Sequence, residues 1–328
     1  MAAKEASKRV KPTLPRSTEQ AMSKIQKAIK DRNFATLDDL NKFLATLTSP
    51  EALDTLGDME LSDKEAAQEL AFDAMEAESA AQARKLAKRA LALDPDCVDA
   101  LVVLTELDAR SPRKAIEGLQ KAVAAGERSL GASFIRENTG YFWGLLETRP
   151  LMRAMEQLAE LYRAEGFYVD AIRIYEKMLE LNPNDNQGVR DPLLGTYLRV
   201  GDLGGAARLL KQYERDSMAN FAWGRVLERY LAGDRVGARA ALKKARVANA
   251  HVELFMTGQK PLPKELPEMY SPGSEEEAVL CIDNVGGAWA GNMEALFWLA
   301  DQCQSPGGNL GTIARKQTKK SAAPPRIQ

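Results

Sequence analysis

Apolar residues recur at intervals of three and four along most of the chain, which is the spacing of one face of an α-helix. Leu151, Met155, Leu158 and Tyr162, for example, are separated by four, three and four residues. Alanine and leucine dominate, and the alternation of β-branched and polar residues that strands need is scarce. The pattern therefore predicts an all-α fold.

The segment 152–185 predicts a pair of helices joined by a tight turn. Gly166 stands where a residue in the left-handed conformation would end the first helix. Ala171 is small enough for the two helices to cross closely, and Pro183 would end the second helix. These intervals are those of a tetratricopeptide repeat.

The same marks recur at a fixed period in both directions. Three glycines are separated by 35 and 32 residues, and three alanines show the same two separations. A right-handed α-solenoid of tetratricopeptide-like helix hairpins is therefore predicted over residues 62–250. The structural marks of this repeat array are Ala83, Pro95, Ala115, Gly166, Ala171, Pro183, Gly201, Ala206, Gly233 and Ala238.

An insertion is predicted between the second and third repeats, at about residues 126–150. The 56 residues from Ala115 to Ala171 are too many for one repeat, and Tyr141, Phe142 and Trp143 stand within the excess. A solenoid buries its core by stacking neighbouring repeats, so an insertion opens a seam. We interpret the three aromatic residues mainly as a plug for that seam, with a ligand-binding rim as the alternative.

Segments of different character flank the array. Residues 17–48 predict a helical hairpin, either packed on the solenoid or independent, and residues 49–61 a linker. Residues 251–305 predict a helical cap over the end of the array, which terminal repeats require. Residues 1–16 and 306–328 are predicted to be disordered basic tails.

The net charge of −1 conceals an uneven distribution. Residues 1–30 carry eight Lys and Arg against two Glu, and residues 302–328 carry five Lys and Arg and no acid. The body between them is therefore acidic. Solvated tails are the main interpretation, and weak binding of nucleic acid through those tails is the alternative.

Three stretches allow a family resemblance to be stated. "GYFWGLLETRPLMRAMEQLAELYRAEG", "LNPNDNQG" and "SPGSEEEAVLCIDNVGGAWAGNMEALFWLADQ" resemble bacterial tetratricopeptide proteins related to the suppressor of tumorigenicity 7 family. The likeness covers residues 71–300. It implies an α-helical repeat protein without a known reaction or cofactor. Pro192 and Gly195 depart from the pattern and should delay or kink one helix.

Residues suited to catalysis or metal binding are few. His251 is the single histidine, and Cys97, Cys281 and Cys303 have no metal-ligand spacing. The odd, scattered cysteines are typical of a reducing compartment, and there is no apolar run of a membrane span or a secretory signal. The sequence predicts a cytoplasmic protein that is not an enzyme and has no cofactor, metal site or membrane contact.

The predicted function is protein–protein interaction. By the tetratricopeptide resemblance, the first helix of each repeat lines a concave groove for a partner protein or peptide. Acidic residues in its middle favour a basic and apolar partner segment over a chaperone carboxylate. The groove candidates are Gln68, Phe72, Met75, Val102, Glu106, Arg153, Glu156, Glu160, Asp191, Leu198, Asn220, Trp223, Leu227 and Tyr230.

Trp223 and Tyr230 are the predicted anchors for that partner. Packing of these two residues against the C-terminal cap is the alternative. At the level of function, two other classes stay open: a nucleic-acid-associated regulator that uses the basic tails, and an enzyme with a pocket at the aromatic insertion.

Overall fold

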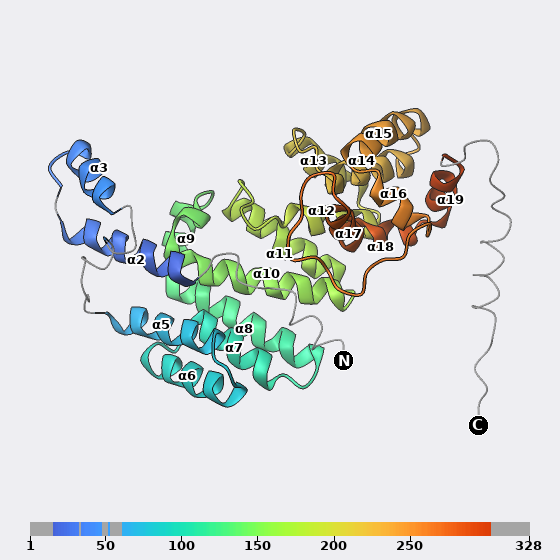
Figure 1. The fold of residues 1–328 in the computed structure, drawn as a ribbon. Coiled ribbons are helices and arrows are strands. Elements are labelled where there is room, and N and C mark those ends of the chain that lie inside the picture. Colours follow the sequence, from blue (N-terminus) through green and yellow to red (C-terminus); the bar gives the residue numbers. More distant parts are fainter. Residues whose placement is uncertain (1–15, 33, 48–51, 53–60, 303–328) are drawn as a thin grey trace, which may run out of the picture. The chain divides into compact units, whose positions relative to one another are not determined.

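The computed structural model describes residues 16–32, 34–47, 52 and 61–302. Within these residues every regular element is a helix, so the all-α prediction is confirmed (Figure 1). The chain divides into two compact units, Met1–Thr196 and Tyr197–Gln328. The predicted basic tails, apart from Arg16, and nearly all of the predicted 49–61 linker lie outside the described residues.

Unit 1 is built from helices that pack as adjacent pairs. α5 packs with α6, α7 with α8, and α10 with α11. Serine side chains cap three of these helices at their N-termini, since Ser62, Ser79 and Ser111 each accept a backbone N–H of the first turn. The helices are α2 (Arg16–Asp31), α3 (Leu37–Thr46), α5 (Asp63–Met75), α6 (Ala80–Leu93), α7 (Val98–Asp108), α8 (Pro112–Leu130), α9 (Ala132–Asn138), α10 (Arg149–Ala164) and α11 (Tyr168–Leu181).

The boundary between the units falls within α12 (Arg190–Val200). This helix starts only after the segment 183–189, in agreement with the late helix start expected from Pro192. In unit 2, α14 packs with α15, and the helices near the C-terminus pack on α14. The remaining elements are α13 (Leu203–Gln212), α14 (Ala219–Leu231), α15 (Arg235–Ala248), α16 (His251–Met256), α17 (Glu275–Cys281), the π-helix η3 (Ile282–Gly286), α18 (Gly287–Ala290) and α19 (Met293–Gln302).

The three predicted glycine turns share one geometry. Gly166, Gly201 and Gly233 have φ values of 81°, 77° and 81°, a conformation that glycine adopts without strain. In each turn the next residue donates its N–H to the carbonyl five positions earlier, over 2.8, 2.9 and 3.0 Å. Ala171, Ala206 and Ala238 are completely buried in the helices that follow, and the prolines at 95 and 183 each stand two residues after a helix end.

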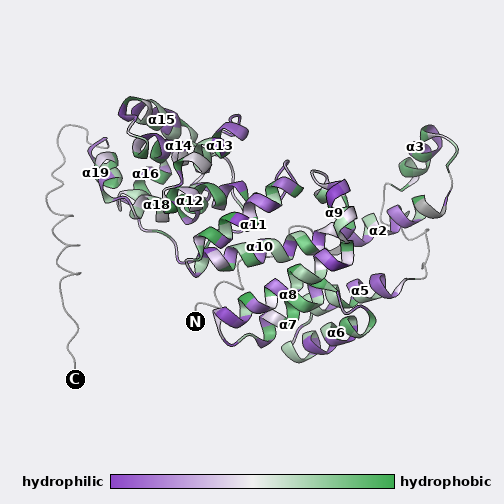
Figure 2. Cartoon of the chain, turned by 180° about the vertical axis from the view of Figure 1, so that it is seen from behind, coloured by the Kyte–Doolittle hydropathy of each residue, from purple (hydrophilic) through white to green (hydrophobic). Residues whose placement is uncertain are grey.

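Small side chains allow the paired helices to approach closely. In unit 1 one buried cluster joins alanines of α5 and α6 with Cys97, and a second joins α7, α8 and α10. Ala83 belongs to the first cluster, and Ala115 packs against the second while partly exposed. Hydrophilic and hydrophobic residues alternate around the same helices, as amphipathic packing requires (Figure 2).

The first residues of the predicted insertion, at about 126–150, belong to the helix α8. α8 continues to Leu130, its last buried residue being Gly126, and the irregular segment starts at Gly131. It contains α9 and two short 3₁₀ turns, η1 (Phe142–Gly144) and η2 (Leu146–Thr148). The side chains of Phe142 and Tyr141 are 0% and 76% exposed. Phe142 alone therefore has the burial of a plug.

The predicted 17–48 hairpin forms two helices that differ in packing. α2 contacts η2 of the insertion. α3 buries none of its residues, and Leu37 at its start is 78% exposed. No described helix combines the length and the apolar character needed to cross a lipid bilayer.

Candidate functional site

A pocket of about 420 Å³ lies in unit 1 under α2. α5, the last turn of α8, the 94–98 turn, the η2 segment and the first turn of α10 provide its other walls. The volume is within the range of sites that hold a small ligand or a few side chains. We call it the α2 pocket, and its apolar lining includes Leu61, Phe72, Val98, Leu130, Leu146 and Leu151.

α2 turns a polar face toward this pocket. The residues that it contributes are Glu19, Gln20, Ser23, Gln26 and Lys27. Their spacing of one, three, three and one places them on a single face of the helix. A polar helix face therefore lies over a lining with a substantial apolar part.

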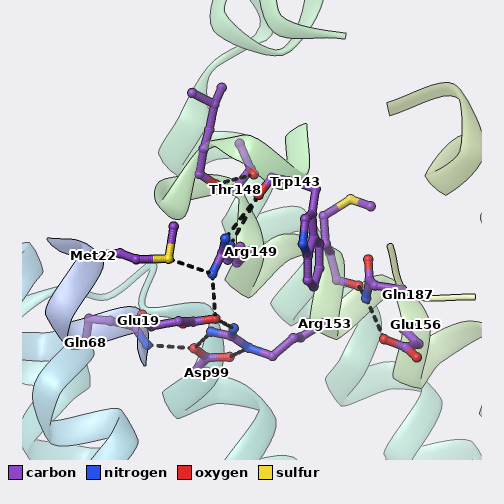
Figure 3. Close-up of polar contacts among 12 residues, drawn as sticks. Glu19, Met22, Gln68, Asp99, Trp143, Thr148, Arg149, Arg153, Glu156 and Gln187 are labelled. Carbon is purple, nitrogen blue, oxygen red and sulfur yellow. Dashed lines mark hydrogen bonds and ion pairs between the residues drawn. The ribbon is translucent and has the colours of Figure 1, made fainter. Parts of the chain in front are cut away.

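Buried charges connect α2 to the core of unit 1 beside this pocket. Arg153 of α10 donates from Nη1 to Glu19 of α2 over 2.8 Å. It also donates from Nε and Nη2 to the two carboxylate oxygens of Asp99 of α7, over 3.2 and 2.5 Å. Gln68 of α5 donates to the same carboxylate over 2.7 Å. Figure 3 shows these groups converging from four helices.

A second arginine extends this group toward the insertion. The guanidinium of Arg149 lies 3.6 Å from the Glu19 carboxylate and donates to the backbone carbonyl of Trp143 over 3.3 Å. Its central carbon lies 5.2 Å from the Trp143 ring centroid, a cation–π contact (Figure 3). We call Glu19, Gln68, Asp99, Arg149 and Arg153 the arginine cluster.

The four charged members of the cluster are almost completely shielded from water. The exposed fractions of Asp99, Arg149, Arg153 and Glu19 are 1%, 3%, 6% and 8%. Burial alone would lower the pKa of Arg153, but the carboxylates of Asp99 and Glu19 raise it above its ordinary value. Two guanidinium groups are thus balanced by two carboxylates, and α2 supplies one of the two.

The structure brings several predicted groove residues to this region. Phe72 lines the pocket, and the guanidinium carbon of Arg153 lies 5.9 Å from its ring centroid. Val102 is buried, Met75 packs at the edge of the α5–α6 core, and Glu106 is exposed on α7. Phe72 and Arg153 therefore belong to the site, in contact with each other.

Glu156 and Glu160 are already engaged within unit 1. Gln187 donates to the carboxylate of Glu156 over 2.5 Å. Tyr175 and Arg163 donate to the carboxylate of Glu160. The predicted attraction of a basic partner segment to these two acids is therefore weakened, because both carboxylates have hydrogen-bond donors in their own unit.

Burial raises the pKa of Glu156 to about 7, although the Gln187 hydrogen bond opposes this shift. Because the folded state favours the protonated form, the stabilisation from this group is complete below pH 4.5 and disappears as the pH rises through 7. Between pH 5 and pH 8 this group should lower the free energy of unfolding of the wild type by on the order of 2–3 kcal/mol. Glu156→Gln should lack this pH-dependent loss. Urea unfolding of both proteins at pH 5 and pH 8 measures this, and parallel pH profiles would contradict it.

The predicted anchors in unit 2 lie inside its core. Trp223 and Leu227 have no exposed surface, and Asn220 and Tyr230 are 5% and 8% exposed. Trp223 donates from Nε1 to the backbone carbonyl of Asn249 over 3.1 Å. Trp223 and Tyr230, the two predicted anchors, are therefore inaccessible to a partner in this structure, because other parts of unit 2 cover them.

These residues pack against the C-terminal helices, which was the alternative interpretation. The Tyr230 ring centroid lies 5.0 Å from that of Trp298 in α19. The carboxylate of Glu277 in α17 accepts the N–H of Ala219 at the start of α14, over 2.9 Å. Of the other groove candidates, Leu198 is buried and Asp191 is half-buried in the first turn of α12.

Cys97 and His251, the residue types most often used in catalysis, lie in surroundings that explain them by packing and hydrogen bonding. Burial raises the pKa of Cys97 to about 12, so its reactive thiolate is suppressed. His251 is the first residue of α16, where its N–H donates to the Asn249 side chain over 2.9 Å. No group of three His, Cys, Asp or Glu side chains in the described part of the chain could hold a metal ion.

Sequence reasoning did not select Glu19 and Asp99. One signal was present, since Glu19 is one of only two acids among the first 30 residues. Its partner Arg153 is 134 positions away, so no local pattern could pair them.

No protein-family model and no curated protein matches the chain.

Proposed function

We propose that this protein is a non-enzymatic protein–protein interaction module that binds a helix of a partner protein on unit 1. The observation that carries the proposal is the seating of α2. A helix is held there through a buried ion pair to α10 and over a pocket with an apolar lining. Amphipathic helices in grooves are a common mode of protein recognition.

The proposed architecture behind this surface is a right-handed tetratricopeptide-like solenoid, with an insertion between the second and third repeats and a C-terminal helical cap. The adjacent helix pairs, the shared glycine turns and the buried crossing alanines support it. The likeness to bacterial tetratricopeptide proteins related to the suppressor of tumorigenicity 7 family stays part of this proposal.

Affinity capture with the full-length chain tests the function. Leu61 lines the pocket and is 49% exposed, so Leu61→Glu should change the pocket without breaking the core. Val247→Glu in unit 2 is the matched control, because Val247 is 88% exposed. We expect a partner that the wild type and Val247→Glu both retain, and that Leu61→Glu binds at least tenfold more weakly by calorimetry. Equal binding by all three proteins would refute the proposal.

A further inference from the structure

We propose that α2 occupies, within its own chain, a docking surface for an amphipathic partner helix. That helix carries a carboxylate at the position of Glu19 and apolar side chains toward the α2 pocket. The inference rests on the proposed function and adds the chemistry of the partner and its control by α2. It follows from three observations: the charge balance of the arginine cluster, the polarity of the pocket-facing residues and the incomplete burial of the described part of the 16–46 segment.

The charge balance specifies the anchoring residue. Without α2, Asp99 is the single carboxylate of the cluster opposite Arg149 and Arg153. Both guanidinium groups lie deep in unit 1, where a charge without a counter-ion is unfavourable. A helix that replaces α2 must therefore supply a carboxylate at the position of Glu19.

The pocket specifies the residues that follow this carboxylate. Ser23 and Gln26 of α2 line it, four and seven positions after Glu19, opposite apolar residues such as Phe72 and Leu151. A helix with larger apolar side chains at these two positions would fill the pocket and bury more apolar surface than α2 does. The expected pattern is an acid followed by apolar residues at the fourth and seventh positions.

Apart from the ion pairs of Glu19, the 16–46 segment is attached by contacts that are only partly buried. Among the side chains of α2 that the structure describes, Glu19 and Ala28 are buried, and most of the others are half-buried. The contacts of Gln20 with Glu69 and of Lys27 with Glu65 are partly exposed to solvent. The following helix, α3, adds no buried residue. A partner with better complementarity can therefore compete with α2 for this surface.

A labelled peptide of residues 16–31 added to the full-length chain tests whether α2 blocks the site. We expect weak binding to the wild type, because α2 occupies the surface. Glu19→Gln in the chain removes the buried carboxylate, and Lys27→Glu replaces an ion pair of 3.3 Å by repulsion from Glu65. Both chains should bind the wild-type peptide at least tenfold more tightly in fluorescence anisotropy.

The control on the chain is Lys42→Glu, the same charge change on α3, where Lys42 pairs with Asp38 and both are exposed. It should bind the peptide as weakly as the wild type. Lys27→Glu leaves the arginine cluster intact, so a folding defect of Glu19→Gln cannot decide the result alone. Unchanged peptide binding by both loosened chains, with native helix content in circular dichroism, would overturn the inference.

Peptide variants test the expected pattern on the Lys27→Glu chain. A Glu19→Gln peptide should bind at least tenfold more weakly, because it lacks the carboxylate. A Gln26→Leu peptide should bind about tenfold more tightly, since Gln26 lines the pocket and is half-buried, and burial of a leucine is worth that factor. Ala21→Leu is the matched control, as Ala21 does not line the pocket, and should give no gain. Equal effects of the two leucines would overturn the predicted pattern.

Two further outcomes separate this inference from the proposed function. Suppose that a captured partner depends on Leu61 but binds the wild type and Lys27→Glu equally. That result would refute the inference that α2 occupies the surface, and it would leave the proposed function standing. Light scattering that shows dimers of the loosened chains would assign the surface to a second copy, which also refutes the inference. Loss of the dependence on Leu61 would refute the proposed function itself.

Discussion

Replacement of Arg153 by methionine is expected to lower the free energy of unfolding of unit 1 by about 3–5 kcal/mol. Arg153 makes the ion pair that joins Asp99 to α10 and the shorter of the two ion pairs that join Glu19 to α10. Without it, Asp99 keeps Gln68 as a donor, but no other cation among the described residues forms an ion pair with it, at an exposed fraction of 1%. A buried carboxylate without its counter-ion is strongly destabilising.

Urea unfolding, combined with hydrogen exchange of peptides from α7 and α10, measures this loss within unit 1. Arg173→Met is the matched control, since its ion pair with Asp170 is largely exposed, and we expect about 0–1 kcal/mol for it. Adding Asp99→Leu to Arg153→Met should restore much of the stability, because an apolar replacement removes the unpaired charge. A loss for Arg153→Met as small as that for Arg173→Met would contradict the role of the cluster.

The arginine cluster also has a meaning beyond stability. Buried ion pairs often stabilise a fold no better than apolar residues of similar volume, and one well-supported use for them is specificity. Here the specificity concerns which helix lies on α10, because a helix without a carboxylate at the Glu19 position leaves two arginines with one acid. The cluster therefore links the fold of unit 1 to the proposed selection of a partner.

The local features of the fold could be predicted from the sequence. Each predicted glycine turn depends on one residue that tolerates positive φ, and Gly166, Gly201 and Gly233 all have it. The small residues at the crossings obey an equally local rule, and Ala171 and Ala206 are completely buried. Such features depend on residues within one hairpin, which a periodic pattern reveals.

The candidate site could not be predicted in the same way. Its central contact joins Glu19 and Arg153 across 134 positions, and no periodicity relates them. Trp223 is a related example, since the helical pattern left open whether its face lines a groove or packs against the C-terminal helices. The Asn249 segment, 26 positions away, covers it in the structure. Contacts between distant segments decide which amphipathic faces remain accessible.

Replacement of Trp223 by alanine is expected to destabilise unit 2 by about 3–5 kcal/mol, the range for removal of a buried aromatic side chain. The indole has no exposed surface, and the truncation would leave a large cavity and an unpaired carbonyl at Asn249. Tyr141→Ala is the control, because Tyr141 is 76% exposed and its removal should change stability by less than about 0.5 kcal/mol.

Thermal and urea unfolding of both variants, followed by tryptophan fluorescence, measure the difference. Tryptophan fluorescence still reports on the unfolding of unit 2 after Trp223 is replaced, because Trp289 and Trp298 remain in that unit. If Trp223 instead anchored a partner and contributed little to the core, Trp223→Ala would unfold like the wild type and lose partner binding. The burial of Trp223 predicts the opposite result, in which Trp223→Ala loses stability because its core is disrupted. Trp223→Phe retains most of the apolar volume and should bind a partner as the wild type does.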